Sequence, residues 1–370
     1  MALNIKSLIF LFFSLTLLTS WSCSDDSIDS GNSDDNSVPN SNVVPSNLIL
    51  TTVLQGADSN NPYGNGSGIV NFNAQAIDAV SYGFVIDGGT EVQSTDGTLL
   101  YTFNTKEGIE YYNVTVIAYS STNDAIETSA NVAVSYYIGT PPVWADEFFQ
   151  TGAPNSENWT YDLGAGGWGN NEAQTYTNNA ANVIVEDGVL KIMAKASGSG
   201  YTSSRLKSIG LVEFKYGRLD VRAKLPSSAG TWPAIWMLGA NFPSVGWPAC
   251  GEIDIMEQTG WDKNKTLGTC HWLNTSNSSY ASYGLDTAIS NVSSEFHVYS
   301  LEWSANSIKI LVNDIQFFVM NSDGSAIPNT PFQNDFFIIL NVAMGGSLGG
   351  DIPSNFTEDR MEVDYIRLFQ

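Results

Sequence analysis

Histidine, cysteine and basic residues are all scarce in this chain of 370 residues. It holds two histidines and three cysteines, too few for the usual ligand spacings of a zinc cluster, so a metallohydrolase is not expected. Lys and Arg total 15 against 38 Asp and Glu, which gives a net charge of −23. A surface this acidic repels nucleic acid, anionic lipid and sulfated polymers. We therefore expect a neutral partner and no nucleic acid.

Long apolar runs are also missing. The apolar stretch from about Leu8 to Leu18 is shorter than the roughly 20 residues that span a bilayer, and it indicates an export signal over residues 1–22. Cys23 then opens an acidic tract, which resembles the site where bacterial lipoproteins are acylated, although Ser20 stands where leucine is usual. We expect lipidation at Cys23 and a bacterial outer-membrane lipoprotein, at the cell surface or in the periplasm, that contacts the membrane only through this anchor. Plain secretion is the alternative.

Sustained helical periodicity is absent, and the chain is expected to be all-β. Residues 23–44 are rich in Ser, Asn and Asp and predict a flexible acidic linker. Over residues 45–138, short alternating runs such as GIVNFNAQA and YYNVTVIAY indicate a small β-sandwich. The sequence of this region resembles the immunoglobulin-like or PKD-like modules of bacterial polysaccharide hydrolases. The module can serve as a spacer or can bind sugar, and the sequence does not distinguish the two roles.

Residues 143–370 again read as strands, including FFIILNVAMG and MEVDYIRLFQ. VIVEDGVLKIMAKA predicts two strands around an Asp-Gly turn. About 230 residues of strands in one piece indicate a large two-sheet sandwich of the jelly-roll type.

The segment GEIDIMEQTG carries the candidate chemistry. In a strand, Glu252 and Asp254 project from one face while Ile253 fills the other, because the side-chain period is two. Glu257 is then out of phase. One extra residue, a β-bulge at Ile255 or Met256, restores its phase and brings three carboxylates into a row.

Three neighbouring carboxylates fit a glycosidase. With about four strand steps, roughly 13 Å, between the Cα atoms of Glu252 and Glu257, side chains that lean together bring the carboxyl groups to about 5–5.5 Å, the separation of a retaining enzyme. Like charges raise one another's pKa values, so one group stays ionised to attack while another stays protonated to donate. Taken alone, EIDIME also fits a surface strand that is acidic on its wet face.

Nearby tryptophans favour the glycosidase interpretation. Trp232 and Trp236 are four residues apart, hence on one face of a strand, and Trp247 stands five residues before Glu252. Indole rings on the carboxylate face stack on the apolar C–H faces of sugars. Ordinary core packing is the alternative, most of all for Trp236.

Seven blocks carry a family resemblance over the whole of residues 143–370, namely WGNNEAQTYT, GTWPAIWMLG, WPACGEIDIMEQTGW, GTCHW, EFHVYSLEW, ILNVAMGG and VDYIRL. They resemble the laminarinase branch of glycoside hydrolase family 16. The resemblance implies a concave jelly roll with E-x-D-x-x-E on a bulged strand. It implies Glu252 as nucleophile, Asp254 as assisting carboxylate and Glu257 as acid/base, with no cofactor for catalysis.

Further site residues are implied by the same resemblance. Asn171 and Arg205 match hydrogen-bond donors of the donor subsites, and His271 matches a cleft histidine beside the acid/base; a structural role stays open for the first two. Relatives also hold a structural calcium ion remote from the cleft. The carboxylates of Glu147 and Asp364 and the carbonyl of Gly188 match that site.

Cys250 and Cys270 lie symmetrically about the predicted turn near Trp261. They can face each other across a hairpin and form a disulfide, but such bonds between adjacent strands are strained. Two free buried thiols are the alternative.

Taken together, the sequence predicts a monomeric, endo-acting, retaining β-1,3-glucanase that cleaves a neutral, laminarin-like glucan. Mixed β-1,3/1,4-glucan is a candidate second substrate. One alternative is a family relative that acts on an algal galactan such as agar, porphyran or carrageenan. The other is a non-catalytic glucan-binding surface protein.

Overall fold

The computed structural model describes residues 43–58, 61–323 and 331–370. The predicted export signal, the lipidation site Cys23 and the linker up to residue 42 lie outside the described residues. Within the described ranges, no helix is long and apolar enough to cross a membrane.

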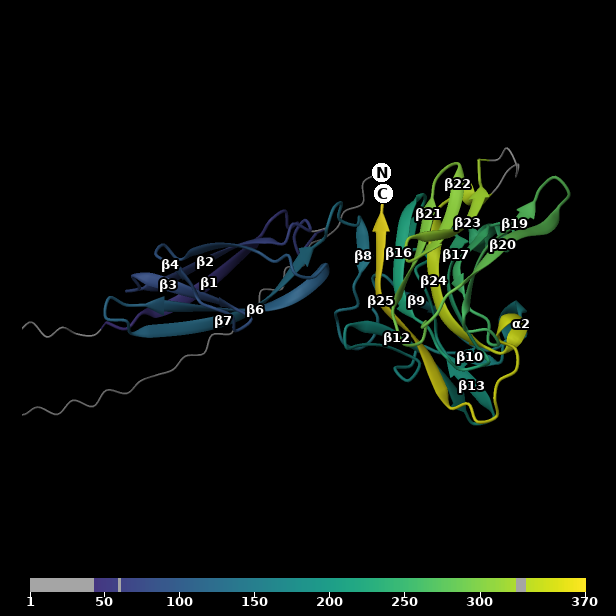
Figure 1. Ribbon diagram of the computed structural model, residues 1–370, viewed down its shortest axis with the longest axis horizontal. Helices are drawn as coiled ribbons and strands as arrows, with labels where there is room; N and C mark the ends of the chain where they lie inside the picture. The colour runs from purple at the N-terminus through teal and green to yellow at the C-terminus, as the bar shows by residue number, and fades with distance from the viewer. Residues whose placement is uncertain (1–42, 59–60, 324–330) are drawn as a thin grey trace, which may run out of the picture. The chain divides into compact units, whose positions relative to one another are not determined.

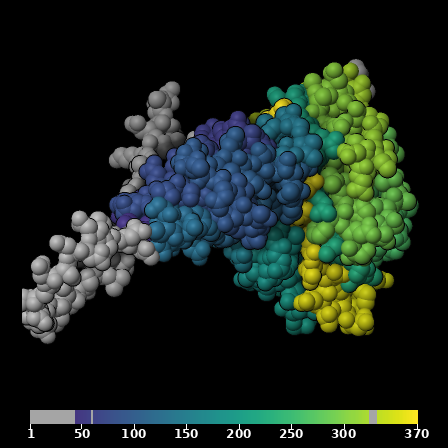
Figure 2. Space-filling model, turned by 60° about the vertical axis from the view of Figure 1, so that its left-hand side comes forward, coloured from purple at the N-terminus to yellow at the C-terminus, as the bar shows by residue number. Residues whose placement is uncertain are grey.

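The described residues form a small and a large sandwich (Figure 1). Each has its own main hydrophobic core, and the large one has a smaller cluster besides. The small sandwich packs a sheet of order β1-β2-β5 on a sheet of order β4-β3-β6-β7. Its strands are β1 (Ser46–Leu54), β2 (Ile69–Ile77), β3 (Ser81–Ile86), β4 (Val92–Ser94), β5 (Thr98–Thr102), β6 (Gly108–Tyr119) and β7 (Ala125–Tyr136). Phe72 and Phe84 lie in its core with no exposed area. The space-filling view shows this part in purple and blue (Figure 2).

The large sandwich has two broad sheets. Its first strands are β8 (Trp144–Asp146), β9 (Thr160–Asp162), β10 (Gln174–Tyr176), β11 (Val183–Glu186), β12 (Val189–Ser197), β13 (Gly200–Ser203), β14 (Arg205–Lys207), β15 (Glu213–Phe214) and β16 (Gly217–Lys224). The others are β17 (Thr231–Gly239), β18 (Glu252–Glu257), β19 (Lys265–Asn274), β20 (Ser279–Ala288), β21 (His297–Trp303), β22 (Ser307–Val312), β23 (Ile315–Asn321), β24 (Phe336–Met344) and β25 (Glu358–Phe369). Helical turns among the described residues are short: η1 (Gly167–Gly169), α1 (Phe242–Val245), η2 (Pro331–Gln333) and α2 (Gly346–Gly349).

One sheet, which we call the cleft sheet, runs in the order β20-β19-β18-β17-β24-β14-β9. The other, which we call the outer sheet, runs in the order β10-β13-β12-β25-β16-β21-β22-β23. The all-β prediction and the two-sheet jelly-roll prediction are both confirmed.

Local sequence explains these strands. In β12 the buried side chains of Leu190, Ile192 and Ala194 alternate with the outward Lys191. The residues Asp187 and Gly188 both have positive φ, 57° and 75°, and join β11 to β12, as the Asp-Gly turn predicts.

Strand β24 lies inside the cleft sheet between β17 and β14, and its nine residues are all buried. It pairs with β17 along its full length, and β17 in turn pairs with β18. Strands that are buried on both sides hold neighbouring backbones rigidly, so β17 and β24 fix the position of β18 and its acidic side chains.

Candidate active site

Strand β18 carries the three carboxyl groups, and a bulge sets their phase. Against β17, Asp254 pairs with Trp236 and Met256 pairs with Ile235, so Ile255 is the additional residue. This is one of the two predicted positions for the bulge. Ile253 and Ile255 point into the core with no exposed area, whereas Glu252, Asp254 and Glu257 all line the same cleft.

The cleft has a volume of about 420 Å³ and crosses the cleft sheet from β18 to β14. Aromatic and acidic side chains dominate its walls. Its lining residues are Asp162, Trp168, Gly169, Asn170, Glu172, Arg205, Trp232, Ala234, Trp236, Leu238, Phe242, Trp247, Glu252, Asp254, Glu257, Asn341 and Ala343.

All three predicted tryptophans lie in this cleft. The indole Nε1 of Trp232 donates a hydrogen bond of 3.0 Å to Oε1 of Glu257. Trp236 donates to Asn341 Oδ1 at 2.7 Å, and Trp247 is 50% exposed. Trp232 therefore orients an acid directly, while the half-exposed Trp247 lines the cleft with its ring 5.3 Å from that of Tyr280.

His271 lies beside the acids, as the pairing of β18 with β19 requires. Glu252 is its cross-strand partner, and its Nε2 lies 3.0 Å from Asp254 Oδ2 and 3.7 Å from Glu252 Oε1. Its other ring nitrogen, Nδ1, is 2.6 Å from the hydroxyl of Tyr280 on β20. Sequence reasoning missed Tyr280, although it lies on the same hairpin as His271.

Burial and mutual repulsion shape the charges of the acids. Burial, and then the charge of Asp254, raise the pKa of Glu252 well above its ordinary value. Burial and the charge of Glu257 do the same for the pKa of Asp254. Burial also raises the pKa of Glu257, and the hydrogen bond from Trp232 opposes this. Ionisation of any one of the three groups therefore disfavours ionisation of the others.

A hydrogen-bonded chain supports the cleft from behind. Asn341 accepts from Trp236 and donates 3.0 Å to the hydroxyl of Tyr176, which donates 3.2 Å to Glu172. Glu172 also accepts from Asn170 and Gln174. The chain links β17, β24 and β10 to the loop that forms one wall.

Arg205 lines the cleft, whereas Asn171 does not. The guanidinium of Arg205 stacks 4.6 Å from the ring of Trp236 and pairs with Asp162 at 3.0 Å. Asn171 is exposed, with φ of 58°, and its neighbour Asn170 lies in the wall instead. Asn171 is therefore not among the residues that line the cleft, because the backbone reverses through a positive-φ turn there. Its place in a donor subsite stays a prediction.

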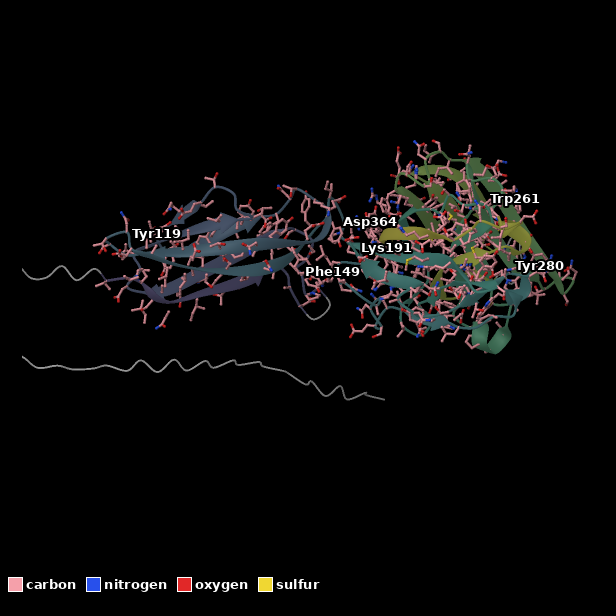
Figure 3. The ribbon with its side chains drawn as sticks, turned by 90° about the horizontal axis from the view of Figure 1, so that it is seen from below. Tyr119, Phe149, Lys191, Trp261, Tyr280 and Asp364 are labelled. Carbon is pink, nitrogen blue, oxygen red and sulfur yellow. The ribbon has the colours of Figure 1, made fainter. Side chains whose placement is uncertain are left out.

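The residues of the predicted calcium site lie on the outer sheet, away from the acids, where Figure 3 labels Asp364. Glu147 receives two hydrogen bonds, of 2.8 and 3.1 Å, from Arg367. Asp364 pairs with Arg222, and Gly188 occupies the β11–β12 turn. An arginine therefore pairs with each of the two carboxylates, and the calcium ion stays a prediction.

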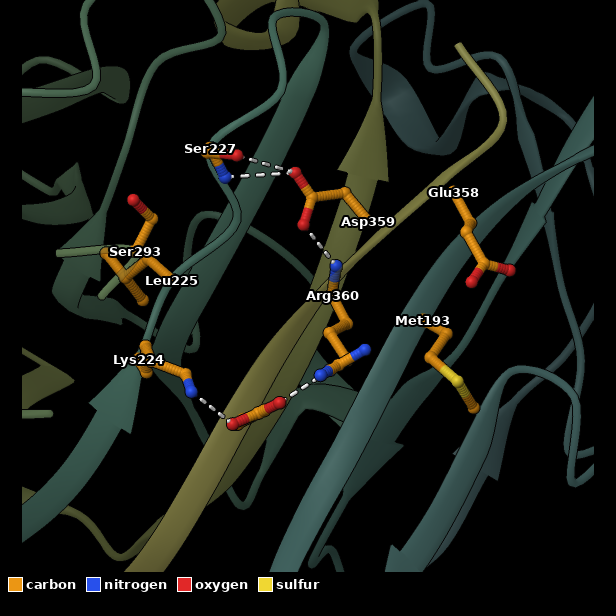
Figure 4. Close-up of a pocket in the computed structure, with 9 residues that line it drawn as sticks. Met193, Lys224, Leu225, Ser227, Ser293, Glu358, Asp359 and Arg360 are labelled. Carbon is orange, nitrogen blue, oxygen red and sulfur yellow. Dashed lines mark hydrogen bonds and ion pairs between the residues drawn. The ribbon is translucent and has the colours of Figure 1, made fainter. Parts of the chain in front are cut away.

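A second pocket, of about 240 Å³, lies on the outer sheet (Figure 4). Its charges are satisfied internally: Glu362 pairs with Lys224 and Arg360, and Asp359 accepts from the backbone of Ser227 and Ser228. No aromatic side chain is among the residues that line it. It lacks the sugar-stacking surfaces that the main cleft has.

Cys250 and Cys270 are both free and buried. The thiol alternative therefore holds for the described chain. Burial raises the pKa of both thiols, that of Cys250 to about 11, so neither is a thiolate nucleophile at neutral pH.

Comparison with known proteins places this geometry in context. The model of the family described as glycosyl hydrolases family 16 matches residues 170–367. A beta-glucanase of Rhodothermus marinus is 37% identical over 241 residues, which cover 62% of this chain and 84% of that protein.

Solved structures of similar sequence share this fold. The crystal structure of LamAcat from Zobellia galactanivorans is 46% identical, with a TM-score of 0.57, and the match covers 62% of this chain and 98% of that one. A LamA variant from the same organism, in complex with laminaritriose and laminaritetraose, is 45% identical with a TM-score of 0.57, over 62% of this chain and 99% of that one.

Proposed function

The chain belongs to family 16 of the glycosyl hydrolases, and we propose that it is an endo-acting, retaining β-1,3-glucanase that cleaves a laminarin-like glucan. One observation carries the proposal: Glu252, Asp254 and Glu257 stand in a row on a bulged strand and open into a tryptophan-lined cleft. The bound ligands of the similar LamA variant are laminarin oligosaccharides, which supports the same class of substrate here.

In the proposed mechanism, Glu252 attacks the anomeric carbon and forms a covalent glycosyl-enzyme intermediate. Glu257 gives its proton to the departing glycosidic oxygen, then takes a proton from the water that hydrolyses the intermediate. Burial raises the pKa of Glu257 and so favours the protonated form that the first step requires. The pKa of Glu252 is raised as well, so the acids titrate as a coupled group, and attack requires Glu252 to be the ionised member. Each step inverts the anomeric carbon, so the product keeps the β configuration.

Asp254 and Trp232 position the two glutamates. Asp254 lies between them on the strand. Its charge is the second cause of the raised pKa of Glu252, and burial is the first. The indole N–H of Trp232 fixes one oxygen of Glu257, which leaves the other oxygen to face the scissile bond. His271 brings the ring nitrogen Nε2 close to Asp254 and Glu252 and lowers the pKa of Glu252, in opposition to burial.

The cleft favours a neutral chain over a sulfated galactan. Arg205 is the one basic residue among the residues that line the cleft in the described part of the chain, and Asp162 already pairs with it. Lys207 pairs with Asp162 as well. A sulfate ester would thus find no unpaired cation, whereas exposed indole rings suit the apolar faces of glucose units. Mixed β-1,3/1,4-glucan is proposed as a second substrate on the same grounds.

The test is the release of reducing sugar from laminarin, barley mixed-linkage glucan, agarose and carrageenan. Wild-type protein should act on laminarin, and Glu252→Gln should lose activity by on the order of 10⁴-fold or more, as enzymes do without their nucleophile. Glu157→Gln, on an exposed loop outside the cleft, is the matched control and should be unchanged. Activity on a galactan alone would overturn the substrate; binding without turnover by wild type would favour the glucan-binding alternative.

We also propose that the protein is exported and anchored as an outer-membrane lipoprotein, with secretion as the alternative, and that it acts as a monomer. The apolar run before Cys23 and the acidic tract after it support the anchor. Labelling with a radioactive or clickable fatty acid in wild type and in Cys23→Ser tests it, and unchanged labelling of the variant would exclude Cys23.

A further inference from the structure

We propose that Glu252, Asp254 and His271 together bind one Zn²⁺ ion, and that this ion competes with the glucan by occupying the nucleophile. One oxygen from each carboxyl group and one ring nitrogen of His271 lie within 4.8 Å of one another. The spacing of these three residues in the sequence does not indicate a metal site, because His271 reaches the acids only through the pairing of β18 with β19. The proposal uses residues of the proposed mechanism, but zinc binding needs no substrate.

The distances fit a tetrahedral zinc ion. With bonds of about 2.0–2.2 Å to nitrogen and oxygen, two ligands of a tetrahedral zinc are about 3.4 Å apart. The Nε2 of His271 lies 3.0 Å from Asp254 Oδ2 and 3.7 Å from Glu252 Oε1, and these two distances bracket that value. All three ligand atoms lie within 4.8 Å of one another, so zinc binding would draw the two carboxylates together where they are further apart than that value. Because Glu252 and Asp254 line the cleft, a fourth position remains open to water.

Asp254 gives independent support. The residue is 3% exposed, and its Oδ2 has no hydrogen-bond partner among the described residues. The contact with His271 is close but lacks hydrogen-bond geometry. Buried carboxylate oxygens almost always have a hydrogen-bond partner. Oδ2 of Asp254 has none, so either a proton or a bound cation is needed to satisfy it.

Tyr280 prepares the histidine for a metal. Its hydroxyl lies 2.6 Å from Nδ1 of His271 and its ring stacks on the imidazole at an interplanar angle of 20°. When Nδ1 carries the proton and donates a hydrogen bond to the Tyr280 hydroxyl, Nε2 is unprotonated and its lone pair points at the carboxylates. Histidine ligands of zinc are oriented in this way by their other ring nitrogen. Figure 3 labels Tyr280 on the side of the domain that carries the cleft sheet.

The ligand set selects zinc over hard cations. Ca²⁺ takes six to eight oxygen ligands and Mg²⁺ requires a near-ideal octahedron, whereas two carboxylate oxygens and an imidazole suit zinc. We therefore expect millimolar Ca²⁺ and Mg²⁺ to leave zinc binding unchanged.

Isothermal titration of ZnCl₂ into the full chain, without a histidine tag, tests the site. One ion per chain is expected. Tyr280→Phe should weaken binding by about 10- to 100-fold, the range for groups that orient a ligand, and His271→Gln should weaken it further. His297→Gln removes the other histidine of the sequence, which lies on the outer sheet, and should leave the affinity unchanged.

Two readouts keep the proposal falsifiable if a variant does not fold. Zinc should inhibit laminarin hydrolysis competitively, with recovery on adding EDTA, and zinc-soaked wild-type crystals should show an anomalous peak between the three ligands. Unchanged affinity in folded His271→Gln, or an anomalous peak only elsewhere, would overturn the site. If laminarin is not cleaved at all, the titration still decides, so failure of the proposed function and failure of the zinc site are distinguishable.

Discussion

At the scale of single residues, the active site holds three carboxyl groups in surroundings that disfavour the ionised form of each. Glu252, Asp254 and Glu257 are close together and largely buried, and the pKa of each is raised. Burial and like charge are the means by which glycosidases keep one carboxyl protonated at working pH. The same means destabilise the fold, so function and stability oppose each other here.

The first prediction concerns Asp254→Asn. The charge of Asp254 is the second cause, after burial, of the raised pKa of Glu252. Removing that charge favours the ionised nucleophile, so the acidic limb of the kcat/KM profile on laminarin should move to lower pH, with reduced activity at the optimum. Asp220→Asn, on the outer sheet, is the control. An acidic limb that stays in place would show that Asp254 does not act on Glu252 through its charge.

The second prediction concerns stability. Because the folded-state pKa of Glu257 is raised, the folded protein holds this proton more tightly than the unfolded chain, whose glutamates titrate near about 4.3. Stability is therefore lost as pH rises from that value through the folded pKa. Glu257→Gln keeps an acceptor for Trp232 and should raise Tm at pH 7–8, by about 2–4 °C for each kcal/mol relieved, but not at pH 4. A Tm difference that is equal at both pH values would refute this linkage.

Residue identity was predictable where spacing was informative. The period of two placed Glu252 and Asp254 on one face, and the need to restore phase located the bulge. Asn170 lines the cleft but was not predicted, because alternation fails where Trp168 and Asn171 take positive φ. A motif in a loop predicts that donors are present, but not which side chain faces the cleft.

At the scale of elements, three strands and one loop hold the cleft through a single chain of hydrogen bonds, Trp236 to Asn341 to Tyr176 to Glu172. The Tyr176 hydroxyl is the link between the sheet and the loop. Sequence could not identify this chain, since β24 reads FFIILNVAM and is buried along its whole length, so no pattern shows which face carries Asn341. Tyr280 was missed because a side chain across a hairpin depends on register.

Tyr176→Phe is the third prediction. It leaves the buried amide N–H of Asn341 without its acceptor and removes one of the three donors to Glu172. An unsatisfied buried donor costs about 1–3 kcal/mol, and the loss loosens the wall formed by residues 167–172. We expect KM for laminarin to rise about 5- to 100-fold, the equivalent of that cost at 1.4 kcal/mol per factor of ten, with a smaller change in kcat. Tyr201→Phe, on the outer sheet, is the control. A fall in kcat alone would place Tyr176 in the chemistry instead of the wall.

At the scale of the whole molecule, composition predicted the class of partner and the class of fold. The net charge of −23 predicts that polyanions are repelled. The regular alternation of short apolar runs predicted two-sheet architecture, because alternation needs only the strand period and no knowledge of pairing. Strand order, cleft shape and the partners of each carboxylate follow from pairing between distant segments, so they needed the structure.

The fourth prediction follows from the charge. A neutral glucan has no long-range Coulomb interaction with an acidic protein, so kcat/KM on laminarin should change by less than about twofold between about 50 mM and about 500 mM NaCl. Steady-state kinetics across that range check it. A steep rise of kcat/KM with salt would indicate that the substrate itself is anionic.

The central claim is retaining cleavage of a β-1,3-glucan by Glu252 and Glu257, and proton NMR of laminarin during the first minutes of hydrolysis tests it most directly. The account predicts that the β-anomeric proton of the new reducing ends appears first, with the α-anomer growing later by mutarotation, and that Glu252→Gln gives neither signal. An α-anomer that appears first would contradict the two-step mechanism and the role of Glu252 as nucleophile.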